Sequence, residues 1–211
     1  MTLASGTATS GSISTLTDGT HTVTAVYNGN TNFATSADTL SGGQVVNQAA
    51  ASTVVASSLN PSTYGQPVTF TATITGENGQ VKGRASGRAA KPPAVTGTVA
   101  WSSNTGCGTT NVTSGNPGVA TCTTSSLGVG TDTITATYSG DSNHSGSSGT
   151  LSGGQAVDQA TTSTSIASSL NPSSYGQAVS FTASVEAVAP GAGTPSGTVQ
   201  FSIDGSALDQ R

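Results

Sequence analysis

The sequence is poor in charged residues and in cysteine. Charged residues make up 7% of the 211 residues, and the net charge is −4. An acidic, weakly charged chain has no electrostatic reason to bind nucleic acid or an anionic membrane. Two cysteines are too few for a four-ligand metal site. No apolar run reaches the roughly 18 residues that span a bilayer, so we expect no membrane insertion.

Residues arranged for catalysis are equally scarce. The two histidines, His21 and His144, are far apart, no pair of acids shares a motif, and no catalytic triad can be composed. We therefore expect neither an enzyme nor a cofactor. The start of the chain, MTLASGTATSG, has no basic region followed by an apolar one, so the signal peptide of an exported parent would lie outside these residues.

Short runs of alternating apolar and hydroxyl side chains take the place of charges. In PVTFTATIT (67–75), apolar residues point to one face and threonines to the other, as in a half-buried antiparallel strand. The segments 97–102 and 131–138 alternate in the same way, and no stretch has useful helical periodicity. The sequence predicts an all-β protein with a core that includes Val68, Phe70, Ile74, Val99, Trp101, Ile134 and Tyr138.

Three motifs recur, each 111 residues further along the chain. They are TLSGGQ at 39 and 150, SSLNPS at 57 and 168, and the pair GTHTVTAVY and GTDTITATY at 19 and 130. Solenoid coils repeat every 20–50 residues or so, whereas about 100 residues is the size of an immunoglobulin-type sandwich. The period therefore predicts tandem β-sandwiches.

Aligning the copies predicts one complete domain flanked by two incomplete ones. Residues 48–158 hold every element once, with an inserted basic loop at 76–95. Residues 1–47 match the C-terminal half of that unit, and residues 159–211 match its N-terminal half.

The order of these motifs resembles that of bacterial Ig-like repeats. The motifs are SSLNPS.YGQ.V.FTA, then GTV, then GT.T(V/I)TA.Y.G(D/N).N, then TLSGGQ, and they cover nearly the whole chain. Such repeats occur in tandem in large secreted and surface-anchored bacterial proteins. The resemblance implies immunoglobulin-like sandwiches, an extracellular or cell-surface location, and a structural or adhesive role.

In that exported context, Cys107 and Cys122 are candidates for a disulfide. Cys107 follows the predicted strand at 97–102 by a short turn, and Cys122 lies in VATCTT, where a neighbouring strand is expected. A bridge would close a loop of roughly fifteen residues and stabilise the fold by about 3 kcal/mol. The alternative is two inert buried thiols. A catalytic cysteine is not expected, because no histidine stands near either one in the predicted fold.

Four of the five basic residues fall within the insertion at 76–95. One interpretation is a solvated loop between strands, and the other is contact with a polyanion such as an acidic glycan. These residues are Lys82, Arg84, Arg88 and Lys91.

The turn GDSN (140–143) supplies Asp141 and Asn143, oxygen ligands suited to calcium. The matching turn of the first copy reads GNTN, with Asn30 in place of the acid. One carboxylate makes a poor calcium site, so we expect no metal and a turn stabilised by the Asx side chain. His144 stands where the first copy has Phe33, and we expect it to be a half-exposed packing residue.

Three functional hypotheses follow. The first is a structural spacer or stalk, favoured because the connector QAAAST (48–53) has no Gly/Ser-rich or Pro-rich tract to make it flexible. The second is an adhesive module for a glycan or protein ligand. The third is a homo-oligomer that assembles head to tail, with residues 1–47 of one chain covering residues 159–211 of the next.

Overall fold

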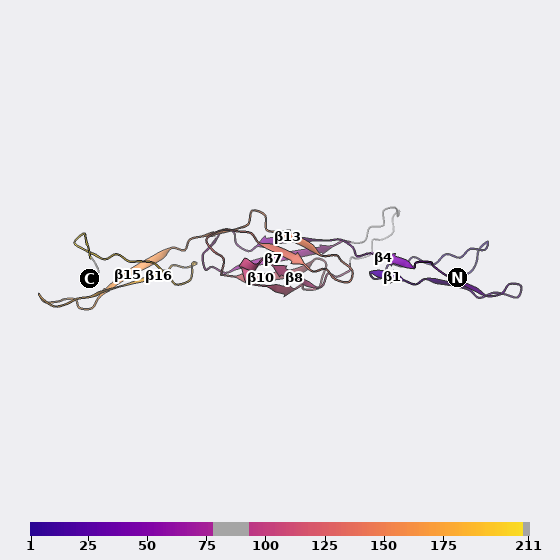
Figure 1. Ribbon diagram of the computed structural model, residues 1–211, viewed down its shortest axis with the longest axis horizontal. Helices are drawn as coiled ribbons and strands as arrows, with labels where there is room; N and C mark the ends of the chain where they lie inside the picture. Colours follow the sequence, from indigo (N-terminus) through magenta and orange to yellow (C-terminus); the bar gives the residue numbers. More distant parts are fainter. Residues whose placement is uncertain (78–92, 209–211) are drawn as a thin grey trace.

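The computed structural model describes residues 1–77 and 93–208. Figure 1 shows a chain drawn out along one axis, with a β-sandwich at its centre and the two termini in opposite end segments. Within the described residues, helix is limited to one 3-10 turn, η1 (Ser103–Thr105). None of the described helices is long and apolar enough to cross a membrane.

The central sandwich is built from ten short strands, in line with the predicted all-β fold. Its first five strands are β5 (Ala51–Ser57), β6 (Ser62–Thr63), β7 (Val68–Gly76), β8 (Thr98–Trp101) and β9 (Thr109–Asn111). The other five are β10 (Gly118–Thr124), β11 (Gly130–Asp132), β12 (Thr135–Tyr138), β13 (Ser147–Thr150) and β14 (Gln155–Asp158). They form sheets in the orders β10-β7-β5, β13-β12-β8-β9 and β11-β14-β6, and the pair β14-β6 is parallel.

The core lies between the β10-β7-β5 sheet and the β13-β12-β8-β9 sheet. In β7 every second residue from Val68 to Ile74 is buried, so the period of two in the sequence places its apolar face inward. Burial of these side chains supplies most of the driving force for folding. All seven residues expected in the core are buried: Val68, Phe70, Ile74, Val99, Trp101, Ile134 and Tyr138.

The strand expected at 131–138 is two strands. β11 pairs with β14, whereas β12 pairs with β13 and β8, so the chain changes sheets at Thr133 and Ile134. The inward alternation continues through the break, because Ile134 is fully buried although it lies outside both strands. The predicted alternation of side chains was therefore correct, whereas the predicted single continuous strand was wrong.

Each end segment carries four short strands. The N-terminal segment (residues 1–47) holds β1 (Gly19–His21), β2 (Thr24–Tyr27), β3 (Ser36–Thr39) and β4 (Gln44–Val46). The C-terminal segment (residues 159–208) holds β15 (Thr162–Ser168), β16 (Phe181–Ala187), β17 (Ser202–Ile203) and β18 (Ser206–Ala207).

The strand registers of the end segments repeat those of the centre. Gly19 is paired with Val46 as Gly130 is with Val157, which is the same pairing 111 residues later. The pair β2-β3 matches β12-β13, and the pair β15-β16 matches β5-β7, at the same offset. The sequence period is thus also a period of local structure. The division into one complete and two incomplete domains stays a prediction.

Hydroxyl groups face each other across the outer surfaces of the sheets. Threonine suits these positions because it favours extended backbone and its hydroxyl remains in contact with water. The pairs, with their oxygen–oxygen distances, are Thr24 and Thr39 (3.0 Å), Thr69 and Thr123 (2.9 Å), Thr135 and Thr150 (3.3 Å), and Thr137 and Ser148 (3.0 Å).

Candidate functional site

The loop between β12 and β13 is built on the carboxylate of Asp141. Its Oδ1 accepts hydrogen bonds from the backbone N–H groups of Asn143 and His144, both at 2.8 Å. Its Oδ2 accepts from the N–H of Thr96 at 2.9 Å and from the Thr96 hydroxyl at 3.3 Å. Both oxygens are therefore occupied by donors from the protein itself.

The corresponding loop of the N-terminal segment forms the same turn with an amide. Oδ1 of Asn30 accepts from the N–H groups of Asn32 at 2.8 Å and Phe33 at 2.9 Å. The expected Asx turn is present in both copies, so neither loop needs an ion to hold its shape. Among the described residues, no group of three or more His, Cys, Asp or Glu side chains is placed to hold a metal.

The hydrogen bonds at this turn set the charge of its carboxylate. Burial raises the pKa of Asp141, but the backbone N–H groups of Thr96, Asn143 and His144 outweigh burial and lower it from 3.8 to about 2. At the neighbouring Tyr138, burial and then the Asp141 carboxylate raise the pKa well above its usual value. At neutral pH the site therefore holds a charged carboxylate beside a neutral phenol.

His144 is fully buried, which corrects the expectation of a half-exposed side chain. Its Nδ1 lies 3.0 Å from Oδ1 of Asp141. The other edge of the ring faces Gly76, where a Cβ would overlap it, so the missing side chain at Gly76 makes the space for His144. The prediction relied on the alignment of His144 with Phe33, which is exposed. That alignment does not show the space that Gly76 leaves for the ring of His144.

The connector that enters the central domain covers the same loop. The side-chain amide of Gln48 donates to the carbonyl of Asp141 at 2.8 Å. Ala49 donates through its N–H to the carbonyl of Asn143 at 2.8 Å and accepts from the N–H of Ser145 at 2.9 Å. These bonds bury His144 and fix the connector to the loop.

At the opposite end of the sandwich, two of the recurring motifs bind each other. Gln155 of TLSGGQ is fully buried, and its amide Nε2 donates to the carbonyl of Leu59 at 2.9 Å and to Oγ of Ser62 at 3.2 Å. Its Oε1 accepts from the Ser57 hydroxyl at 2.6 Å. All three partners belong to SSLNPS (57–62). Sequence reasoning missed this cluster, although the glutamine that recurs at 44 and 155 was its signal.

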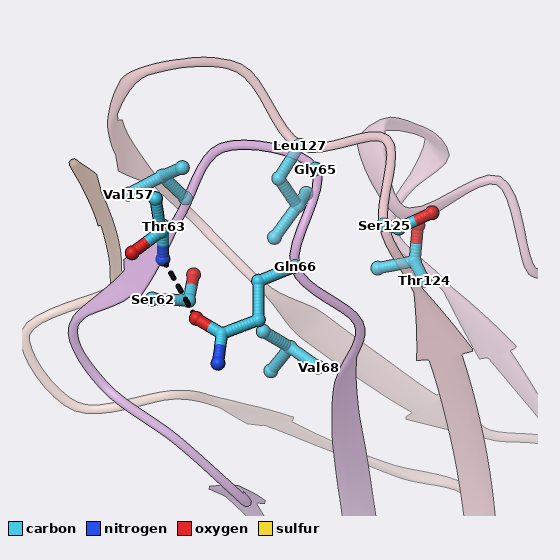
Figure 2. A pocket seen from close by; sticks show the side chains of 9 residues that line it. All are labelled: Ser62, Thr63, Gly65, Gln66, Val68, Thr124, Ser125, Leu127 and Val157. Carbon is cyan, nitrogen blue, oxygen red and sulfur yellow. Dashed lines mark hydrogen bonds between the residues drawn. The ribbon is translucent and has the colours of Figure 1, made fainter. Parts of the chain in front are cut away.

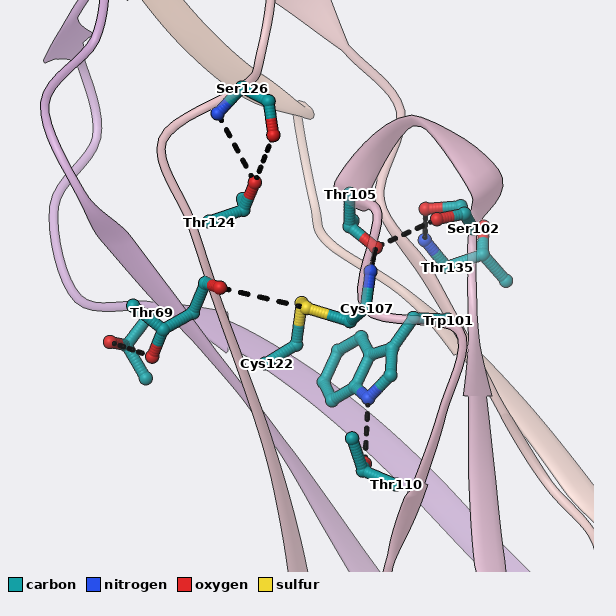
Figure 3. The surroundings of a disulfide bond; sticks show 11 residues. Thr69, Trp101, Ser102, Thr105, Cys107, Thr110, Cys122, Thr124, Ser126 and Thr135 are labelled. Carbon is teal, nitrogen blue, oxygen red and sulfur yellow. Dashed lines mark hydrogen bonds between the residues drawn. A yellow bond between two sulfur atoms is a disulfide. The ribbon is translucent and has the colours of Figure 1, made fainter.

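Cys107 and Cys122 form a disulfide that joins the two main sheets (Figure 3). Cys122 lies in β10, Cys107 follows η1 at the end of β8, and their Cα atoms are 5.8 Å apart. The ring of Trp101 lies beside the bridge and donates from Nε1 to the hydroxyl of Thr110 at 2.9 Å.

The sequence of this two-sheet, disulfide-linked domain matches a known family. Residues 54–157 match the family model of bacterial Ig-like domains, group 3. The central domain is a bacterial Ig-like domain. The resemblance in the sequence motifs and the predicted all-β, Ig-like fold are thereby confirmed, and the tandem arrangement of such domains stays a prediction. No curated protein matches the chain.

Membership in this family sets the broad class of function. Bacterial Ig-like domains are typically non-enzymatic structural modules, usually found outside the cell or at its surface. The buried polar clusters at Asp141 and Gln155 agree with a structural role, because each one ties loops together and leaves no reactive group exposed.

A small hollow lies beside β6 in the Ig-like domain (Figure 2). Gln66 crosses it and accepts through Oε1 from the N–H of Thr63 at 3.0 Å, and Val68, Leu127 and Val157 also line it. The side chains leave no space in it for a water molecule. This hollow is a packed turn and cannot accept a small-molecule ligand.

A larger pocket lies where the Ig-like domain meets the C-terminal segment. It encloses about 370 Å³. Tyr64 and Val129 line it from the Ig-like domain, and Ala160, Ala187 and Pro195 line it from the C-terminal segment.

The residues proposed to contact a polyanion lie outside the described residues. They are Lys82, Arg84, Arg88 and Lys91. Polyanion binding therefore stays a prediction.

Acid should destabilise the Ig-like domain through Asp141. Its pKa of about 2 in the folded state lies below the ordinary 3.8, so the carboxylate stabilises the fold above about pH 4. That contribution, about 2 kcal/mol, should be lost as the pH falls from about 4 toward 2. In Asp141→Asn this part of the pH dependence should be absent. Chemical unfolding at about pH 6 and about pH 2.5 measures the difference.

The matched control is Asp158→Asn, which removes an exposed carboxylate in β14. It should keep the pH dependence of the unmodified chain. At neutral pH, Asp141→Asn should itself be less stable, since its amide N–H₂ would face the N–H of Thr96. An Asp141→Asn chain that loses as much stability in acid as the unmodified chain would contradict the assignment.

Proposed function

We propose that this chain is part of a stiff, non-enzymatic spacer in an extracellular bacterial protein. The observation that carries the proposal is the close junction between the Ig-like domain and the C-terminal segment. The N–H of Ala192 donates to the carbonyl of Tyr64 at 3.1 Å. Gly65 lies so near that a Cβ on it would overlap the carbonyl of Ala192. Direct backbone contact of this kind limits the motion that loosely joined domains show.

The connector on the other side of the Ig-like domain supports the same conclusion. Gln48 and Ala49 are hydrogen-bonded to the loop at 141–145, so the connector is held against the domain that it enters. The extended arrangement of the three parts in Figure 1 is the shape that a spacer requires.

The disulfide supports the extracellular location. A bridge between Cys107 and Cys122 persists in oxidising compartments, whereas thiols stay reduced in the cytosol. The adhesive hypothesis depends on basic residues that lie outside the described part of the chain, and no contact among the described residues favours it.

Replacing Gly65 with alanine should loosen the junction. The methyl group would meet the carbonyl of Ala192, and the two parts would have to separate. Spin labels at Thr121→Cys in β10 and Ser184→Cys in β16 report the distance across the junction, because both native cysteines are bonded to each other. We expect a narrow distribution of label-to-label distances when residue 65 is glycine and a broad distribution in Gly65→Ala. An excess of unlabelled chain keeps labels on different molecules apart.

Gly176→Ala is the matched control. Gly176 is the counterpart of Gly65, and both have left-handed backbone, with φ of 83° and 80°. Alanine therefore meets the same backbone strain at both sites. No atom lies within 4 Å of the Cβ that would be added at Gly176. A broad distribution in the unmodified chain, or equal broadening in the two variants, would overturn the stiff-spacer proposal.

A further inference from the structure

The end segments expose side chains whose counterparts in the Ig-like domain are buried. Phe181 in β16 is 38% exposed, whereas Phe70, its counterpart in β7, is 0% exposed. Phe181 occupies the same register position, since it is paired with Ser168 as Phe70 is with Ser57. Other such pairs, with the exposed residue first, are Val23 and Ile134, Leu40 and Leu151, Ile166 and Val55, and Val199 and Val99.

The Ig-like domain shows what covers each of these faces. Its β5-β7 face is covered by β12 and β13, which contact β5, and those strands have counterparts in the N-terminal segment, β2 and β3. The C-terminal segment has the counterparts of β5 and β7. We propose that the N-terminal segment of one chain packs onto the C-terminal segment of a second copy, and that together they form an intermolecular Ig-like sandwich. This inference goes beyond the spacer function and does not depend on it.

The buried glutamine gives the first specific contact. Gln44 is the counterpart of Gln155 and is exposed. The groups that would receive it are also present, because Ser168 and Leu170 form the same local turn as Ser57 and Leu59. In the shared sandwich, Gln44 of one chain bonds with the Ser168 hydroxyl and the Leu170 carbonyl of the other.

Strand pairing gives the second specific contact. In the Ig-like domain, Tyr138 of β12 lies opposite Val99 of β8. In the C-terminal segment the counterpart of β8 is residues 198–201, since GTVQ (197–200) matches GTVA (97–100). These residues form no strand. Strand β2 would pair with it and place Tyr27 of one chain opposite Val199 of the other.

The pocket of about 370 Å³ between the Ig-like domain and the C-terminal segment gives the third specific contact. Gln159, Ala160 and Ala187 in its wall are the counterparts of Gln48, Ala49 and Gly76, which enclose the loop of His144. The loop that would enter this pocket from a second copy carries Phe33, which is 66% exposed. An aromatic ring is the kind of group that an apolar pocket of this size accepts.

The two segments lie at opposite ends of the molecule (Figure 1), so one chain cannot close on itself. Contact between unlike surfaces of successive copies does not close into a dimer, and it propagates as an open chain. The expected product is a head-to-tail filament whose length grows with protein concentration.

Two positions fit less well than their counterparts. Ala187 stands where Gly76 leaves space for the ring of His144, so the ring of Phe33 must shift to avoid the Cβ of Ala187. In the Ig-like domain, Gly149 of β13 packs against the backbone of Thr53, and a Cβ there would overlap the Thr53 carbonyl. The counterpart of Gly149 is Asp38, whose side chain must push the partner's strand aside. Asp38→Gly restores the residue of the central domain and should strengthen association several-fold.

Sedimentation velocity over a range of concentrations tests the proposal. The unmodified chain should grow beyond a dimer as its concentration rises. Val185→Asp, at the counterpart of the fully buried Ile74, should weaken association by more than about tenfold, because it buries an unpaired carboxylate. Ser184→Asp adds the same charge to the other face of β16 and should leave growth nearly unchanged.

A mixture shows which ends meet. Tyr27→Asp disables the N-terminal segment, and Val185→Asp disables the C-terminal segment. Each variant alone should be monomeric, and an equimolar mixture should form a dimer and nothing larger. The fluorescence-detected unfolding of the Ig-like domain, which holds the single tryptophan, should be the same in both variants and shows that they are folded.

Any one of four results would overturn the proposal, and three of them are failures of the expected assembly. They are a monomeric unmodified chain at every concentration, equal loss of growth in Ser184→Asp and Val185→Asp, and a mixture that stays monomeric. Growth that persists in Val185→Asp would instead indicate edge-to-edge pairing of exposed strands and would also overturn it. The stiffness of the junction at Gly65 is measured separately, so the spacer proposal stands or falls on its own result.

Discussion

Replacing Phe70 with alanine should lower the free energy of unfolding of the Ig-like domain by about 3–5 kcal/mol. Phe70 is the third residue of β7, is 0% exposed, and is flanked by Cys122 of β10 and Ser57 of β5. Both neighbouring strands are held by continuous ladders, so they cannot move in to fill the space. The loss therefore combines the transfer of a buried ring with the cost of a cavity.

The control for this prediction is Phe181→Ala, the same substitution at the counterpart in β16. Phe181 is partly exposed and lies in the C-terminal segment, outside the Ig-like domain. Denaturant titration followed by the fluorescence of Trp101 reports the Ig-like domain alone, since the chain has one tryptophan. The stability read from Trp101 should change by less than about 0.5 kcal/mol in Phe181→Ala. A loss of similar size in both variants would show that Phe70 is not the centre of an independent core.

Reduction of the disulfide should lower the free energy of unfolding by about 3 kcal/mol, because the bridge closes a loop across a separation of 15 residues. The unfolded chain gains conformational freedom when the bridge is broken. In the folded state the bridge joins β10 of one sheet to the end of β8 in the other, so its loss also removes a covalent link between the sheets. Denaturant titration with and without reductant measures the change.

The double variant Cys107→Ala, Cys122→Ala separates the bridge from other effects of the reductant. Its stability should match that of the reduced chain to within about 1 kcal/mol, apart from the packing lost with the two sulfur atoms. Adding reductant to it should change nothing. Equal stability of the oxidised and reduced forms would contradict the expected role of the bridge.

The core of the Ig-like domain could be predicted from the sequence because it follows a local rule. Every second residue of a strand faces inward, so the alternation in 67–75 identifies Phe70 and Ile74 without any knowledge of the partner strands. The break between β11 and β12 could not be predicted in this way, because alternation continues across it. The change of sheet depends on which strands lie beside each half.

The polar clusters depended on contacts between residues far apart in the chain. The position of His144 is set by Gly76 and by the connector at 48–49, and neither is close to it in sequence. The role of Gln155 is set by Ser57 and Leu59, which lie almost a hundred residues away. The recurrence of both motifs at one spacing carried that information, since two segments that bind each other must be repeated together.

The hydroxyl pairs across the sheets affect how the stability of the protein depends on salt concentration. Residues 1–77 and 93–208 contain no lysine or arginine, so the outer faces of their sheets rely on neutral groups such as Thr69 and Thr123. Dissolved salt screens attraction between ions and has little effect on contacts between neutral dipoles. The contacts on the outer faces of the sheets should therefore be as stable at high ionic strength as at low ionic strength.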